Sequence, residues 1–167
     1  HLRFRRQRQM CIRDSFNTRY IVTSFGWFGG GMDVTPSIKD KKLENWFHKE
    51  LKRSCDKYNK NYYKKYKKWC DEYFYLPHRK ESRGIGGIFF DYKKRNWEKD
   101  FSFVREVGIT FKNISNEIIL KKNKLNWTNK EKEIQYKKRG RYVEFNLLHD
   151  RGTKFGLQTG GNVEAIL

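Results

Sequence analysis

Two aspartates beside glycine are the first residues in this sequence whose types could do chemistry. Asp33 comes two positions after the glycine run 29–31. Asp150 is followed directly by Arg151 and Gly152. A carboxylate at a strand end can accept a proton, and an arginine can hold a substrate carboxylate through two parallel hydrogen bonds. Aspartate and glycine are also common in structural turns, so spacing alone leaves a substrate site and an exposed turn both open.

The other reactive residues follow no common cofactor pattern. The sequence has four histidines, none of them in an HxH or HExxH pattern: His1, His48, His78 and His149. Their spacing therefore gives little support for a metal site. The glycine clusters 26–31 and 84–87 lack the features of phosphate-binding loops. No Lys-Ser/Thr follows the first cluster, and the second continues into an apolar run where a dinucleotide loop needs a helix.

Charge and composition limit the class of protein. The chain has 167 residues, which predicts a single domain, and a net charge of +19. This charge favours polyanionic partners such as nucleic acid, anionic lipid or a substrate with several carboxylates, although lysine also serves simply to solvate a surface. No apolar run reaches the roughly 20 residues of a membrane span, and no secretory signal begins the sequence. Three widely spaced cysteines predict reduced thiols, so we expect a soluble cytoplasmic protein without stable membrane insertion.

Helical periodicity marks three segments that could position these residues. Residues 37–57, 56–74 and 100–120 carry apolar side chains three or four positions apart. In the segment 56–74 the aromatic residues fall on one face and lysines on the others. Alternation of aromatics with lysine can indicate single-stranded nucleic-acid binding, but the helical spacing favours aromatic side chains buried in a core.

Strand-like patterns complete the expected fold. Residues 86–91 form a short apolar run after a turn, and residues 142–149 alternate between apolar and polar side chains. Residues 150–153 then read as a turn into a returning strand over 154–158. This mixture of helices and antiparallel strands predicts the α+β class.

Three long segments resemble the oxygen-dependent coproporphyrinogen III oxidase family: WFGGGMDVTP (27–36), YKKWCDEYFYLPHRKESRGIGGIFFD (66–91) and RGRYVEFNLLHDRGTKFGLQTGG (139–161). The resemblance implies a large flat antiparallel sheet flanked by helices on both faces, and a homodimer to whose interface residues 142–167 contribute. The implied reaction converts two propionates of coproporphyrinogen III to vinyl groups in haem biosynthesis. Oxygen is the co-substrate, and no organic cofactor is used.

The resemblance also implies roles for residues near the two aspartates. Asp33 would stabilise or accept the pyrrole N–H protons, Arg151 would hold a propionate, and Asp150 would orient Arg151 or share in proton transfer. Gly160 and Gly161 match a loop whose backbone contacts substrate, where Asn162 replaces the usual arginine.

Histidine positions are implied in the same way. The family has a histidine, then asparagine two residues on and arginine four on, before its glycine loop. His1 and Arg5 fit as proton donor and substrate contact, while Arg3 stands where asparagine is expected. His48 and His78 match proposed ligands of a divalent metal, whose requirement is disputed in the family.

Two features set limits on this interpretation. Residues 6–23 do not follow the family pattern and could be an artefact of sequence assembly, and we expect residues 1–167 to be a fragment of one domain lacking parts at both ends. Two other functions stay open: a tetrapyrrole-binding protein without catalysis, and a basic nucleic-acid-binding module. We favour the enzyme, with no nucleic-acid partner.

Overall fold

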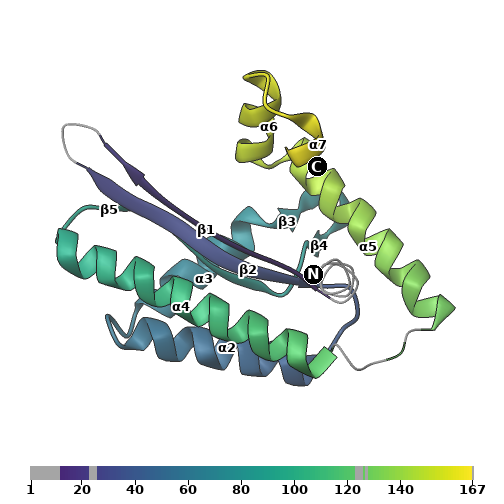
Figure 1. Ribbon diagram of the computed structural model, residues 1–167, viewed down its shortest axis with the longest axis horizontal. Coiled ribbons are helices and arrows are strands. Elements are labelled where there is room, and N and C mark those ends of the chain that lie inside the picture. The colour runs from purple at the N-terminus through teal and green to yellow at the C-terminus, as the bar shows by residue number, and fades with distance from the viewer. Residues whose placement is uncertain (1–11, 23–25, 123–125, 127, 167) are drawn as a thin grey trace.

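A three-stranded antiparallel sheet is the centre of the structure (Figure 1). The computed structural model describes residues 12–22, 26–122, 126 and 128–166. The strands lie in the order β1 (Ile12–Ile21), β2 (Trp27–Pro36), β5 (Gly86–Lys93). β2 therefore pairs on both sides, which places Asp33 opposite Ser15 on one neighbour and opposite Gly87 on the other.

Three helices and the sheet enclose the apolar core. These are α2 (Lys41–Asp56), α3 (Tyr62–Tyr73) and α4 (Trp97–Lys122). Alternate residues of β2 and β5 point towards the helices, among them Met32 and Phe90, and pack with Phe47 and Phe103 in one buried cluster. The three predicted helices and the predicted strand over 86–91 are thus confirmed, with shifted boundaries.

The segment between α3 and β5 forms a small hairpin. It consists of β3 (Tyr75–Leu76), the 3-10 turn η1 (Pro77–Arg79) and β4 (Glu81–Ser82). β3 pairs with β4, and the Arg83 amide then donates to the Phe74 carbonyl (2.9 Å). This hairpin positions Arg83 beside the sheet.

The prediction of strands after residue 142 is wrong. This part of the chain forms the helices α5 (Asn129–Leu148), α6 (Arg151–Gln158) and α7 (Val163–Ile166). α5 begins with a capping box, in which the Thr128 hydroxyl accepts from the Glu131 amide and the Glu131 carboxylate accepts from the Thr128 amide. Only Gln135 and Phe145 of α5 are buried. The alternation of apolar and polar residues over 142–149 therefore has the pattern of a strand, although it lies within a mostly exposed helix.

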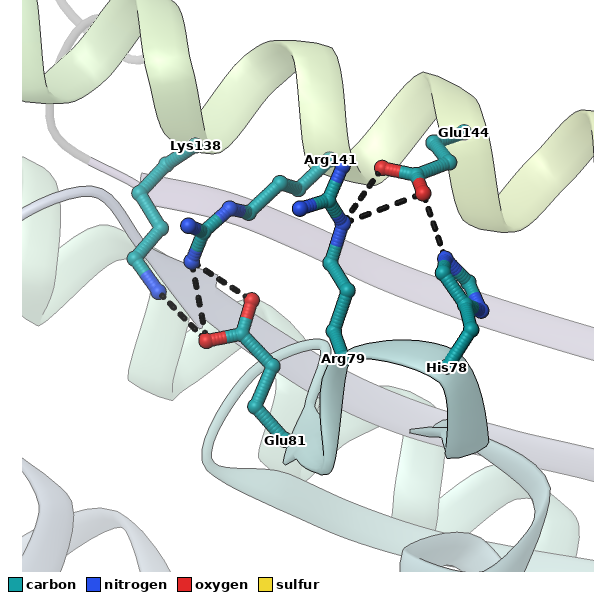
Figure 2. A network of polar contacts seen from close by, with 6 residues as sticks. All are labelled: His78, Arg79, Glu81, Lys138, Arg141 and Glu144. Carbon is teal, nitrogen blue, oxygen red and sulfur yellow. Dashed lines mark hydrogen bonds and ion pairs between the residues drawn. The ribbon is translucent and has the colours of Figure 1, made fainter.

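We call α5–α7 the arm, and charged contacts fasten it to the hairpin (Figure 2). Glu81 of β4 accepts from Arg141 Nη1 (2.6 Å) and lies 3.9 Å from Lys138 Nζ. Glu144 of α5 accepts from Arg79 Nε (2.8 Å) and from His78 Nε2 (2.5 Å). The arm lies beside the sheet and not in the helical layer formed by α2 and α4 (Figure 1).

The predicted α+β class is confirmed, with an antiparallel sheet flanked by helices. Among the helices of the described ranges, none is long and apolar enough to cross a membrane.

Candidate functional site

Asp33 lies buried on the sheet face that points away from α2 and α4. Its side chain accepts hydrogen bonds from the Ser15 hydroxyl and from Arg83 Nη2. Asp33 is 5% exposed and Arg83 is 8% exposed, so both charges are removed from water. A buried carboxylate is stable as an anion only when it is paired in this way. The structure thus assigns Asp33 a partner that the sequence analysis missed.

Arg83 is held in place by aromatic rings. Its guanidinium carbon lies 3.8 Å from the ring centre of Phe74, 4.5 Å from that of Tyr142 and 5.0 Å from that of Phe145. Cations stack favourably on aromatic faces, and arginine does so most often. Because Tyr142 and Phe145 belong to α5, the arm contributes directly to the surroundings of the Asp33–Arg83 pair.

A second arginine–carboxylate pair lies further along the same sheet face. Arg19 of β1 donates to Asp91 of β5 across the glycine positions of β2. Its guanidinium also lies 5.7 Å from the ring centre of Phe89 and 5.8 Å from that of Trp27. Arg19 is about one-third exposed at its side chain, unlike Arg83. Of these two arginines, Arg19 is therefore the one that solvent or a ligand can reach.

The glycines of β2 make room for these side chains. A Cβ on Gly29 would collide with the Asp91 carboxylate and would lie 2.8 Å from Arg19 Nε. A Cβ on Gly31 would lie 2.7 Å from the Ile88 carbonyl oxygen and 3.2 Å from the Phe89 ring. Glycine is thus required for close approach of the backbone at Gly31, and at Gly29 it leaves room for the Arg19 and Asp91 side chains. The result is a strip with an ion pair at each end and Phe89 between them.

The family's histidine–asparagine–arginine spacing fits this strip as well as it fits residues 1–5. Counting from Ser15, asparagine follows two residues on as Asn17, and arginine follows four on as Arg19. Asn17 and Arg19 lie opposite Gly31 and Gly29. The earlier candidates His1, Arg3 and Arg5 lie outside the described residues. Searching for this spacing at every residue before the glycine run would have found Asn17 and Arg19, with Ser15 in place of the histidine.

Asp150 caps a helix and does not close a turn between strands, which corrects the sequence prediction. Its carboxylate accepts from the Thr153 amide (2.7 Å) at the start of α6 and from the Tyr73 hydroxyl (3.0 Å). Burial raises the pKa of Tyr73. The Tyr73 ring stacks on Phe89 at 5.3 Å between ring centres, which links Asp150 to the strip. Arg151 is exposed, and its amide donates to the Tyr73 hydroxyl (3.3 Å).

The predicted glycine loop is the end of α6. The Gly161 amide donates to the Gly156 carbonyl (2.8 Å), and Gly160 has a φ of 72°. This is the hydrogen-bond pattern of a helix that ends on a left-handed glycine. The Asn162 side chain accepts from the Glu164 amide (3.1 Å) at the start of α7. These residues have a structural function in the arm, and Gly160 and Asn162 are exposed.

His48 and His78 do not fit a shared metal ion. His48 Nε2 donates to the Ile85 carbonyl (2.9 Å), while His78 Nε2 contacts Glu144. Burial lowers the pKa of His48, and the hydrogen bond to Ile85 offsets this only in part. No group of three or more His, Cys, Asp or Glu side chains within the described ranges could hold a metal ion. We derive no step through a metal.

Comparison with known sequences finds relatives over most of the chain. The sequence model of a family described as coproporphyrinogen III oxidase matches residues 8–167. Curated proteins named oxygen-dependent coproporphyrinogen-III oxidase from Rickettsia akari (strain Hartford) and Rickettsia bellii (strain OSU 85-389) are each 59% identical over 153 residues, and the one from Rickettsia rickettsii (strain Sheila Smith) is 60% identical. Each alignment covers 91% of the chain and 55% of the relative. The chain thus spans about half the length of the curated relatives it matches.

Proposed function

This chain belongs to the coproporphyrinogen III oxidase family, and on that premise we propose that it supplies the sheet face on which coproporphyrinogen III is oxidised. The observation that carries the proposal is the buried Asp33–Arg83 pair beside the glycines of β2. In the proposed reaction each propionate side chain and one O2 give a vinyl group, CO2 and H2O2. The substrate supplies the electrons, so the balance requires no organic cofactor.

Asp33 is the proposed acid–base group. A carboxylate beside the tetrapyrrole can accept hydrogen bonds from pyrrole N–H groups and take a proton as oxygen attacks the ring. Arg83 and Ser15 fix the Asp33 carboxylate in one orientation, because each donates to a different oxygen. Such preorganisation keeps the group in place before the reaction begins.

Arg19 is the proposed propionate contact of the strip, in place of Arg5. It is the more exposed of the two arginines, and exchanging Asp91 for a substrate carboxylate would keep its charge paired. Arg151, which is exposed beside Tyr73, stays the proposed second contact. Asp150 is proposed to act through Tyr73, with which it shares a hydrogen bond.

The other expectations are proposals of the same kind. We propose a cytoplasmic homodimer with residues 142–167 at its interface. The roles suggested for His1, Arg3, Gly160, Gly161 and Asn162 stay predictions. We do not propose a metal ion at His48 and His78, because the two side chains have separate partners.

Activity assays of single variants test the site. The protein, completed at both ends to the length of its relatives, is incubated with coproporphyrinogen III in air and under argon, and porphyrin products are separated after oxidation. We expect protoporphyrin in air alone. Arg19→Ala should raise KM for coproporphyrinogen about tenfold or more, since a charge-assisted contact to substrate is lost. Arg105→Ala, on the exposed side of α4, is the matched control and should leave both KM and kcat unchanged.

Binding without turnover is the second candidate, because Ser15 stands where the family's spacing has a histidine. In that case coproporphyrin would bind, Arg19→Ala would weaken binding, and no oxygen would be consumed. Ser15→His would then be the variant to restore turnover. If neither turnover nor binding were sensitive to Arg19, the strip would not be the substrate site.

A further inference from the structure

Exposed aromatic side chains gather at one end of the molecule, far from the arm. We call this surface the aromatic end; it consists of Tyr20, Trp97 and Phe101, which surround Phe28. The ring centre of Phe28 lies 4.7 Å from that of Tyr20 and 5.7 Å from that of Trp97. Trp97 and Phe101 stack on each other at 5.2 Å. Figure 1 shows the outer part of the β1–β2 hairpin and the beginning of α4 at this end.

The aromatic end is outside the core of the sheet and helices. Trp97 is 57% exposed, Tyr20 46% and Phe101 45%, whereas Phe103, two residues further along α4, is fully buried. Trp97 and Phe101 are one turn apart, so they form a continuous apolar surface on the first turns of the helix. Contiguous exposed apolar surface with a polar rim is characteristic of an interaction site.

The rim of the aromatic end is basic. Lys94, Arg95 and Lys99 are all exposed, and none of the three forms an ion pair with any residue that the structure describes. Glu98 is the one acidic residue among positions 94–99. Exposed cations that flank Trp97 and Phe101 in the sequence favour an occupant that is both anionic and able to accept apolar side chains.

Charge selects among the occupants of this surface. The chain carries a net charge of +19, and a second copy docked on the same surface would bring like charges together. Nucleic acid would need open ring faces for its bases, but Trp97 and Phe101 stack on each other. An anionic bilayer satisfies both requirements, because tryptophan and tyrosine favour the headgroup layer and each nearby lysine or arginine adds attraction to anionic lipid.

We propose that the aromatic end docks on the surface of an anionic lipid bilayer. Trp97, Phe101 and Tyr20 enter the headgroup layer, while Lys94, Arg95 and Lys99 contact lipid phosphates. The contact is peripheral and reversible, because only the first turns of α4 take part. This inference does not depend on the proposed reaction.

Vesicle binding of the 167-residue chain tests the proposal. The chain is sedimented with vesicles of phosphatidylcholine alone and with vesicles that also contain phosphatidylglycerol. We expect binding to the anionic vesicles only, with a blue shift of tryptophan fluorescence that Trp97→Phe removes. Trp97→Ser combined with Phe101→Ser should weaken binding about tenfold or more. Leu120→Ser is the matched control, because Leu120 is 67% exposed near the other end of α4, and it should bind normally.

A charge-reversal pair separates local docking from general attraction to a basic protein. Lys94→Glu with Lys99→Glu should weaken binding about tenfold or more, since two charges that attract an anionic surface become two that it repels. Lys112→Glu with Lys130→Glu has the same net charge and changes exposed residues elsewhere, so it should weaken binding much less. Circular dichroism confirms that all variants stay folded.

Three results would overturn the proposal. Equal losses in both charge-reversal pairs would mean that binding follows net charge. If light scattering showed a dimer and Trp97→Ser converted it to a monomer, the surface would be assigned to a second copy of the chain. Binding of RNA, but not of vesicles, that depends on Trp97 would assign it to nucleic acid.

Discussion

The body, formed by the sheet with helices α2–α4, and the arm, formed by α5–α7, are held by different kinds of contact. In the body, large apolar side chains from β2, β5 and helices α2–α4 meet in one buried cluster, against which Phe16 of β1 packs. In the arm, Phe145 is the one fully buried apolar side chain of α5. The contacts with the β3–β4 hairpin are ion pairs (Figure 2) and the stacking of His149 on His78. Apolar burial stabilises strongly, whereas exposed ion pairs contribute about 0–1 kcal/mol each. The body is therefore expected to be the stable unit and the arm the more easily detached one.

Arg83 is where these two regions meet. Its guanidinium bonds to Asp33 of the body and stacks on Tyr142 and Phe145 of the arm. The arm thus covers the Arg83 side of the buried ion pair. Detaching the arm would expose this pair to water, so the position of α5 and the chemistry of Asp33 are coupled through one side chain.

Breaking the Asp33–Arg83 pair should have the largest effect. Arg83→Met leaves the Asp33 carboxylate buried without its cation, which costs about 3–5 kcal/mol of the free energy of unfolding. Urea denaturation measures this loss. The double variant Asp33→Asn with Arg83→Met should recover part of it, because neither residue is then charged. If Arg83→Met lowered the free energy of unfolding by less than about 1 kcal/mol, water would have access to the ion pair, and the arm would not exclude it.

Matched phenylalanine deletions compare the two regions directly. Phe103 and Phe145 are both fully buried, and truncation of either to alanine removes about 3–5 kcal/mol of local packing. Phe103→Ala should lower the midpoint of global unfolding. Phe145→Ala should instead accelerate hydrogen exchange in α5 with little change in that midpoint. Equal shifts of the global midpoint would contradict the separation of body and arm.

Loss of the α6 cap should have a smaller and local effect. Asp150→Ala removes the hydrogen bond to the Thr153 amide, which should destabilise α6 by about 1 kcal/mol. Hydrogen exchange over residues 151–158 should accelerate, while exchange in α2 and α4 stays unchanged. Asp150→Asn keeps a capping oxygen and is the control; if it behaved like the alanine variant, the charge and not the cap would be responsible.

Lowering the pH should have the smallest effects, and it should destabilise the body and the arm over different pH ranges. The pKa of His48 is lowered by burial, so the unfolded chain takes up its proton first, and body stability falls as pH decreases below the ordinary value of 6.5. His48→Gln should flatten this dependence. The pKa of Glu144 is lowered by its hydrogen bonds to Arg79 and His78, so arm contacts are lost only as pH decreases below 4.5. Hydrogen exchange between pH 7 and about 3, corrected for the intrinsic pH dependence of exchange, measures both losses. Simultaneous loss of both would contradict the distinction.

The sequence predicted the body better than the arm for a physical reason. Helix α2 places Leu43, Phe47 and Leu51 four residues apart, and all three are buried, so burial and periodicity agree. In α5, Val143, Phe145 and Leu147 alternate with polar residues. Of these three only Phe145 is buried, so the pattern indicated the wrong period. The informative signals were local caps, with Thr128 before α5 and Asp150 before α6.

The candidate site was predicted in part. Asp33 was identified beside the glycines, but its partner Arg83 lies 50 positions away, and no short-range pattern connects the two. Arg19 was missed because the motif was matched only to residues 1–5, although Asn17 and Arg19 have the same spacing. Long-range pairs such as these are set by the register of β2 with its neighbours, which the sequence does not specify locally.

The two buried cysteines make opening of the body measurable by the rate at which their thiols are labelled. Cys55 of α2 and Cys70 of α3 are fully buried, and burial raises the pKa of both thiols, to about 12 for Cys55. Only the thiolate attacks alkylating reagents, so neither residue reacts while α2 and α3 stay packed on the sheet. In a Cys11→Ser background, the rate of thiol labelling therefore counts excursions of the body alone. Because the arm has no cysteine, its detachment and return are not detected by thiol labelling.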